Sequence, residues 1–121
     1  MNNVDKYFLK RCGFREDFDW KNRFDLKTKV EYKGKIYTVS TVDLGLDHNF
    51  GMGKPLYYET MIFLENEDYK NNEFSDFQLR YSTEEEARIS HENIVKAFER
   101  GEIKWKKLWY LFLCLLVMVF Q

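Results

Sequence analysis

The chain has 121 residues, of which 45% are hydrophobic and 18% are aromatic. This length fits one domain, and the composition is sufficient for a hydrophobic core, which excludes a largely disordered protein. The 19 basic and 20 acidic residues give a formal net charge of -1. No overall positive field therefore indicates a nucleic-acid partner.

The ends of the chain and its cysteines bear on the cellular compartment. Residues 1–8 lack the apolar core of a secretory signal. Cys12 and Cys114 lie far apart and no Cys-x-x-Cys pair is present, so the sequence indicates neither a disulfide framework nor a zinc knuckle. We expect a reducing, cytoplasmic setting.

A hairpin is predicted in the first half of the chain. Residues 4–20 mix apolar and charged positions, as in a short amphipathic helix that ends near Gly13 and is followed by an aromatic-rich arm. Residues 27–33 alternate in character and 36–42 are β-branched and aromatic, with a bend at Gly34 and one of its lysine neighbours. This pattern is typical of two antiparallel strands.

Two further strands are predicted after the middle of the chain. Residues 56–64 are apolar at odd and even positions alike, which indicates a strand in the interior of a sheet. Residues 77–81 alternate as a half-buried strand does. The acidic stretch 65–76 has no periodicity and predicts an exposed connection.

A helix is predicted over residues 84–100. Thr83 and Glu86 have the spacing of a capping box, and Gly101 supplies a C-terminal stop. His91 falls on the apolar stripe of this helix, which we expect to face the sheet and which consists of Ala87, Ile94, Val95 and Phe98.

These elements predict a single α+β domain over residues 1–103, with an antiparallel sheet of three or four strands and one long helix packed on it. Residues 104–121 are predicted to form an apolar C-terminal helix. Its thirteen consecutive apolar residues would cover only about 20 Å, too short for a ~30 Å hydrocarbon core. Core or homo-oligomer packing and membrane-surface contact both remain open for Trp105, Trp109, Tyr110, Leu113 and Leu116.

The stretch 41–55 is the candidate binding loop, because it is polar and holds three of the six glycines and the only proline. It is not a phosphate loop, since His48 stands where the first glycine should be and Pro55 follows the lysine. The candidate binding residues are Asp43, Leu46, Asp47, His48, Asn49, Phe50, Lys54 and Tyr57.

A second polar group comprises His48, Glu59, Arg80 and His91. Imidazole and carboxylate could hold a catalytic divalent metal, but no metal-binding motif is present. The structural alternative has His91 bonded to a loop carbonyl, Glu59 paired with Arg80, and Asp47 capping amides of its own loop. We favour this alternative, and we expect no cofactor and no catalytic residue because no nucleophile motif occurs either.

Three blocks of the chain resemble a family of small uncharacterised phage and prophage proteins. They are Val39-Ser-Thr-Val-Asp-Leu-Gly-Leu-Asp-His-Asn-Phe-Gly, Glu59-Thr-Met-Ile-Phe, and Arg80-Tyr-Ser-Thr-Glu-Glu-Glu-Ala with His91 after it. The resemblance covers residues 36–98. Relatives often carry an aromatic residue in place of Asp43 and a glycine in place of Ser90, which argues against a catalytic Asp43.

The resemblance implies a small accessory protein that binds a host protein, such as a non-enzymatic inhibitor of a host defence system. The partner would dock on the loop and its aromatic surroundings. Two alternatives remain open. One is a metal-dependent hydrolase or nuclease that uses His48, His91 and the nearby carboxylates of Asp47 and Glu59. The other is a membrane-associated phage protein held by residues 105–120.

Overall fold

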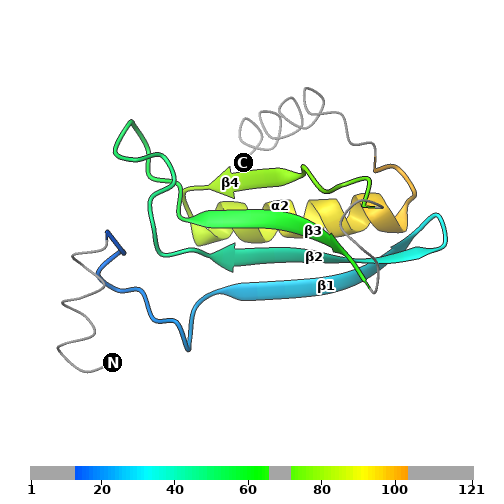
Figure 1. Ribbon diagram of the computed structural model, residues 1–121, viewed down its shortest axis with the longest axis horizontal. Coiled ribbons are helices and arrows are strands. Elements are labelled where there is room, and N and C mark those ends of the chain that lie inside the picture. Colours follow the sequence, from blue (N-terminus) through cyan, green and yellow to red (C-terminus); the bar gives the residue numbers. More distant parts are fainter. Residues whose placement is uncertain (1–12, 66–71, 104–121) are drawn as a thin grey trace.

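The computed structural model describes residues 13–65 and 72–103. They form an open antiparallel sheet with one helix across a face, so the predicted α+β fold is confirmed (Figure 1). The strands lie in the order β1-β2-β3-β4 and the helix follows them; the bounds are β1 Asp25–Tyr32, β2 Lys35–Asp43, β3 Tyr58–Leu64, β4 Gln78–Tyr81 and α2 Glu84–Glu99. The predictions for residues 1–12 and 104–121 lie outside the described residues.

The turn between β1 and β2 sets the register of the predicted hairpin. Lys33 and Gly34 both have positive φ, 51° and 76°, as a two-residue type I′ turn requires at both central positions. Tyr32 therefore faces Lys35 directly across the turn. The predicted hairpin is confirmed, with strands slightly longer than expected.

Helix α2 begins and ends where its capping residues predict. The Thr83 hydroxyl accepts the Glu86 amide at 3.1 Å, and the Glu86 carboxylate accepts the Ser82 amide at 3.2 Å. The first bond satisfies one of the donors that a helix N-terminus leaves unpaired, and the second holds the residue before the N-cap against the first turn. The helix ends at Glu99, and Gly101 follows with φ of 66°.

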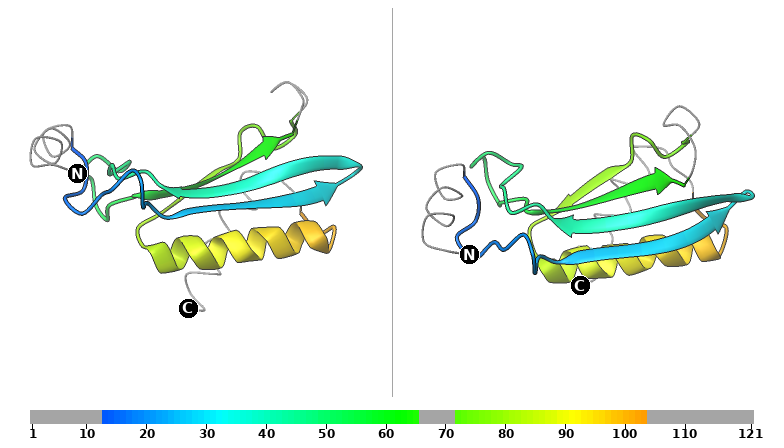
Figure 2. Two further views of the ribbon diagram at one scale, coloured as in Figure 1. Left: turned by 90° about the horizontal axis from the view of Figure 1, so that it is seen from below. Right: turned by 60° about the horizontal axis from the view of Figure 1, so that its bottom comes forward.

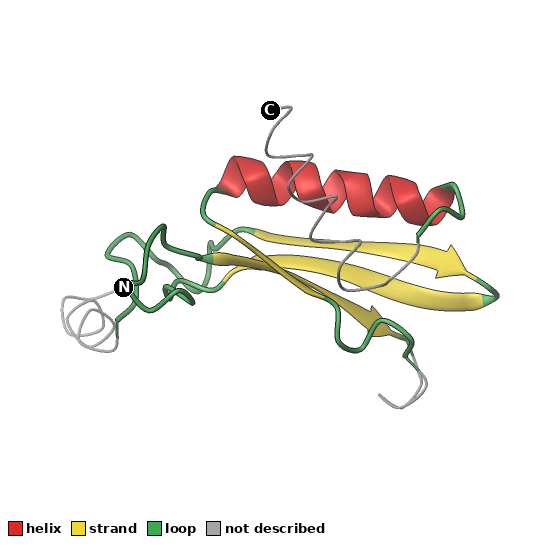
Figure 3. Ribbon diagram, turned by 90° about the horizontal axis from the view of Figure 1, so that it is seen from above, coloured by secondary structure: helices red, strands yellow, loops and turns green. Residues whose placement is uncertain are grey.

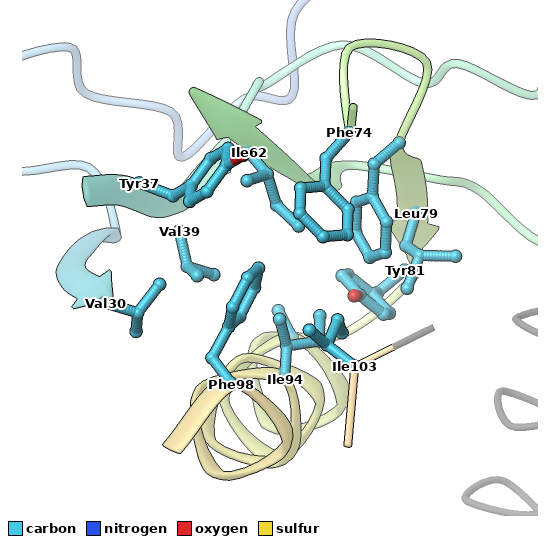
Figure 4. Close-up of a cluster of buried hydrophobic side chains, with 12 residues drawn as sticks. Val30, Tyr37, Val39, Ile62, Phe74, Leu79, Tyr81, Ile94, Phe98 and Ile103 are labelled. Carbon is cyan, nitrogen blue, oxygen red and sulfur yellow. The ribbon is translucent and has the colours of Figure 1, made fainter. Parts of the chain in front are cut away.

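The hydrophobic core lies between α2 and one face of the sheet, and Figure 2 shows the helix running along that face. Opposed residues of neighbouring strands, such as Val39 and Ile62, share this inner face. Figure 4 shows Ile94 and Phe98 of α2 pointing toward them. The buried cluster comprises Val30, Tyr37, Val39, Ile62, Phe74, Phe77, Leu79, Tyr81, Ala87, Ile94, Phe98 and Ile103.

The prediction of an exposed connection over 65–76 is wrong for its described C-terminal part. Phe74 is buried and its ring contacts those of Tyr37 and Phe98, with centroids 5.2 Å from each. Asn72 is also buried; its side chain donates to the Ile62 carbonyl at 3.0 Å and accepts the Phe74 amide at 2.9 Å. Because the stretch is mostly polar, nothing in the sequence indicated that Phe74 is buried or that Asn72 holds its backbone.

The outer face of the sheet carries exposed apolar side chains. Strand β3 is interior in strand order, as predicted, but Phe63 is 49% exposed, and Ile36 of β2 is 47% exposed. Figure 3 shows α2 on the opposite side of the sheet, and no other helix among the described residues covers the outer face. The apolar pattern of β3 therefore fits its interior place in the strand order, and among the described residues no helix covers its outer side.

Candidate functional site

The candidate binding loop joins β2 to β3 and projects from one end of the sheet. The segment 13–24 that precedes β1, here called the arm, lies at the same end (Figures 1 and 3). The two are joined by a β-bridge between Phe14 and Leu46 and by a bond from the Arg15 amide to the Gly45 carbonyl at 2.7 Å. Arm and loop form one structural unit.

Asp47 fixes the backbone of the loop. Its carboxylate accepts the amides of Asn49 at 2.7 Å, Gly51 at 3.0 Å and Leu56 at 3.0 Å. These bonds, chiefly the one from Leu56, lower the pKa of Asp47 below its usual value of 3.8. The predicted capping role of Asp47 is confirmed.

Asn49 closes the loop from within. Its side-chain NH2 group donates to the backbone carbonyls of Lys54 at 2.9 Å and Met52 at 3.2 Å. The backbone carbonyl of Asn49 accepts the backbone amide of Met52 at 2.9 Å. At the base of the loop, the backbone amide of His48 donates to the backbone carbonyl of Leu56 at 2.9 Å. The Lys54 ammonium lies 3.4 Å from Glu86 of α2. The path of this loop is therefore set by short-range hydrogen bonds.

The tip of the loop carries two exposed apolar side chains. Phe50 and Met52 are each 82% exposed, more than the other large hydrophobic residues that the structure describes as exposed. Phe50 also has φ of 53°, a left-handed conformation that a bulky side chain rarely adopts. We call Phe50 and Met52 the tip pair.

Aromatic rings of the arm pack beneath the loop. Phe18 is buried, stacks on Phe14 with centroids 5.4 Å apart, and meets Trp20 edge-on at 5.1 Å. Gly45 has φ of 72°, and a Cβ at this position would lie 2.5 Å from the Phe18 ring. Only glycine combines this backbone conformation with this contact. Trp20 remains 51% exposed.

An ion pair joins the arm to the end of β2. The Arg15 guanidinium donates to both carboxylate oxygens of Asp43, to Oδ1 at 3.1 Å, and Asp43 Oδ1 also accepts the Gly45 amide at 2.9 Å. The guanidinium carbon lies 4.9 Å from the Tyr57 ring centroid. The hydrogen bonds that Arg15 donates to Asp43 are the main cause that raises the pKa of Arg15. Burial raises the pKa of the nearby Tyr58. Asp43 therefore has a structural role, because it joins the arm to the start of the loop through Arg15 and the Gly45 amide.

Glu59 and Arg80 form the predicted ion pair. They are opposed across β3 and β4, and Arg80 Nε lies 3.0 Å from Glu59 Oε2. Gln78 donates to the same oxygen at 2.8 Å. The alternation of β3 and β4 places this pair on the outer face of the sheet, whereas His91 lies on the inner face. The structure does not bring Glu59 and His91 together.

His91 lies in a buried chain of hydrogen bonds between α2 and the inner face of the sheet. Its Nδ1 lies 2.7 Å from the Thr41 hydroxyl, and its Nε2 lies 2.9 Å from the Thr28 hydroxyl. The predicted bond to a loop carbonyl is wrong, because two threonines take that role. His91 faces the sheet, as the apolar stripe of the helix predicts.

The chain of hydrogen bonds continues from Thr41 across the sheet. Thr41 and Thr60 hydroxyls are 2.6 Å apart, the Tyr81 hydroxyl donates to Thr60 at 3.1 Å, and the Ser90 hydroxyl lies 2.5 Å from that of Tyr81. Because Tyr81 donates to Thr60, Ser90 must donate to Tyr81. The Thr60 oxygen can accept a second hydrogen bond, so the donor of the bond between Thr41 and Thr60 depends on the tautomer of His91. In either tautomer, the two threonines that contact it, Thr28 and Thr41, hold the His91 ring against the inner face of the sheet.

The pH dependence of stability provides a test of this arrangement. Burial lowers the pKa of His91 below its usual value of 6.5, an effect that the nearby Glu92 only partly offsets. The unfolded chain therefore binds a proton near pH 6.5 that the folded chain does not bind, so the free energy of unfolding should fall as the pH drops below about 6.5. Chemical denaturation of the protein and of a His91→Gln variant between pH 7.5 and 5 measures the effect. If the free energy of unfolding falls with pH equally in both proteins, the prediction for His91 is wrong.

The two histidines do not form a metal site in this structure. Both ring nitrogens of His91 face threonine hydroxyls on the inner face, while His48 lies in the projecting loop. Within residues 13–65 and 72–103, no three His, Cys, Asp or Glu side chains gather in a position to hold a metal ion. The hydrolase alternative therefore gains no geometric support from the described residues.

The structure adds residues that the sequence did not single out. Arg15 and Phe18 hold the arm to the loop, and Met52 joins Phe50 at the tip. Thr28 and Thr41 hold His91. The sequence contained a signal for Thr28, since it stands between the apolar residues Leu26 and Val30 at alternate positions of β1. Thr41 likewise follows Val39 at an alternate position of β2. Trp105, Trp109, Tyr110, Leu113 and Leu116 lie outside the described residues.

Comparison with known proteins gives no relative from which a role could be transferred. No family model matches the chain, and neither curated proteins nor solved structures give a significant match.

Proposed function

We propose that this chain is a non-enzymatic binding protein, and that the tip pair inserts into an apolar pocket of a partner protein. In line with the sequence resemblance, the partner is a host protein and the chain is a phage or prophage accessory protein, such as an inhibitor of a host defence system. The exposure of Phe50 and Met52 on a hydrogen-bonded loop carries the proposal.

Phe50 supports a binding role because it contributes little to the fold. Its side chain is 82% exposed, so it gains little from burial. Its φ of 53° carries a conformational cost that glycine or asparagine would largely avoid. Strained residues of this kind cluster at functional sites, where a contact made elsewhere offsets the cost.

The fixed backbone of the loop also favours binding. Asp47 and Asn49 hold the tip by hydrogen bonds to its backbone, so little conformational entropy is lost when a partner engages it. Aromatic residues, methionine and arginine are enriched in protein interfaces. The arm, which lies at the same end of the molecule as the loop (Figure 3), adds Trp20 and Arg23, and the guanidinium carbon of Arg23 lies 5.1 Å from the Trp20 ring centroid.

The membrane alternative has no support in the described helix. Within residues 13–65 and 72–103, α2 is neither long enough nor apolar enough to cross a bilayer. The residues on which that alternative depends, 105–120, lie outside the described part of the chain.

The proposal is tested with a Phe50→Asn, Met52→Ser double variant. Asparagine tolerates positive φ, so the melting temperature should stay the same or rise. Binding to a partner isolated from bacterial host extract should weaken at least about 30-fold, because buried hot-spot residues contribute about 2 kcal/mol or more each. Titration calorimetry with the purified partner measures the affinity.

A Lys96→Ser, Glu99→Ser variant is the matched control, since it shortens two exposed side chains near the end of α2 that lies away from the loop. It should bind as tightly as the unchanged protein. A tip variant that keeps full affinity would refute the proposed site, as would an equal loss of affinity in both variants.

The rigidity of the loop gives an independent prediction. Asp47→Ala leaves the tip pair in place but removes the acceptor of three backbone amides. The loop would then have to become ordered when the partner binds, which costs conformational entropy. The affinity for the partner should therefore fall roughly five- to thirtyfold, about 1–2 kcal/mol. Faster hydrogen exchange of the Asn49 and Gly51 amides in the free variant would accompany the loss. Unchanged affinity with faster exchange would show that preorganisation is unimportant.

A further inference from the structure

The outer face of the sheet carries an apolar stripe that no described helix covers. Phe63 lies opposite Thr38, which is two residues from Ile36, so Ile36 and Phe63 are diagonal neighbours on β2 and β3. Met61, half-buried and two residues from Phe63, extends the stripe on the same side of β3. These side chains form a surface about two strands wide.

The stripe and the end of the described chain occupy the same end of the molecule. Ile36 is the second residue of β2, next to the β1–β2 turn, and Phe63 is the penultimate residue of β3. The described chain stops at Ile103, which is buried and whose carbonyl accepts the Tyr32 hydroxyl at 3.2 Å beside that turn (Figure 1). Eighteen further residues follow, and positions 108–120 are all apolar.

We propose that residues 108–120 of the same chain dock on the stripe formed by Ile36, Phe63 and Met61. The four residues 104–107, three of them lysines, can span about 14 Å when extended. Because the tether starts beside the β1–β2 turn, at the end of the sheet where Ile36 lies, it has only to pass that end to reach the outer face. Thirteen helical residues would cover about 20 Å, close to the roughly 23 Å length of the seven-residue strand β3.

The short connection favours the chain's own segment over a second copy. A tether of four residues holds the segment near the stripe at an effective concentration in the millimolar range. The lysines of the tether can stay in water at the sheet edge while the apolar residues after them leave it. Docking would thus cover two apolar surfaces at once.

Hydrogen exchange of the full-length protein, followed by mass spectrometry, tests the proposal. Peptides from 108–120 should be protected, and Ile36→Thr with Phe63→Thr should speed their exchange about five- to thirtyfold. Peptides from α2 should be unchanged, which shows that the fold is kept. Lys27→Thr is the control on the polar part of the same face, and it should leave the exchange of 108–120 unaltered.

Three results would overturn the proposal. Exchange of 108–120 that does not respond to the double variant would place the segment elsewhere. Protection that rises with protein concentration would assign the stripe to a second copy. Protection that arises only when anionic phospholipid vesicles are added would assign residues 108–120 to a membrane surface.

Discussion

A Gly45→Ala substitution should lower the free energy of unfolding by about 2–5 kcal/mol. A Cβ at this position would lie 2.5 Å from the Phe18 ring, and φ is 72°. Left-handed backbone costs roughly 1–2 kcal/mol for an alanine, and overpacking adds about 1–3 kcal/mol. Because Phe18 is buried within the arm, the damage should spread from the loop to the arm. Urea denaturation followed by tryptophan fluorescence measures the loss.

Gly51→Ala separates the two causes. Gly51 has nearly the same φ, 75°, but no heavy atom lies within 4 Å of the position of its Cβ. Its replacement should cost only the conformational part, about 1–2 kcal/mol. Equal losses in the two variants would show that the contact between Gly45 and Phe18 is unimportant.

His91→Leu should lower the free energy of unfolding by about 2–4 kcal/mol at pH 7.5. The substitution removes the partner of the Thr28 hydroxyl and leaves the buried Thr41 hydroxyl with Thr60 alone. Each buried polar group that loses its partner costs about 1–3 kcal/mol. Thermal and chemical denaturation of the variant give the value.

A double-mutant cycle tests whether His91 and Thr41 act as one unit. The cost of His91→Leu combined with Thr41→Val should fall short of the sum of the single costs by about 0.5–3 kcal/mol. The Thr41 hydroxyl, which His91→Leu leaves with Thr60 as its one remaining partner, is then absent. Additive costs would mean that the 2.7 Å contact between the two side chains contributes little to stability.

Local sequence patterns predicted much of the fold. The turn at Gly34, the capping box at Thr83 and the stop at Gly101 each depend on backbone geometry that a few neighbouring residues determine. The orientation of His91 toward the sheet was predicted from its place on the apolar stripe of the helix. The strand order was not predicted beyond the hairpin and the interior place of β3; in the structure each strand pairs with the next one along the chain.

Long-range partners could not be predicted in this way. Thr28 and His91 are separated by 63 positions, and Arg15 and Asp43 by 28, so no periodicity relates them. The burial of Phe74 was missed because its neighbours are polar, although one aromatic ring can fill a gap in a core.

The candidate site was predicted in part. The role of Asp47 followed from its position before Asn49 and Gly51, a sequence in which a carboxylate caps nearby amides. The loop was identified by its glycines and by its place between strands. The exposure of Met52 had no sequence signal, since a methionine in a loop can equally fold back onto the core.

Photo-crosslinking from the loop tip tests the central claim most directly. A benzophenone amino acid at position 52 replaces one member of the tip pair, and the same group at Glu99, an exposed position at the far end of α2, is the control. In bacterial host extract, irradiation should give one discrete crosslinked protein from position 52 and none from position 99, and a Phe50→Asn substitution should reduce the yield. The absence of a crosslink at position 52, or the same products from both positions, would contradict the assignment of the loop tip as the docking element.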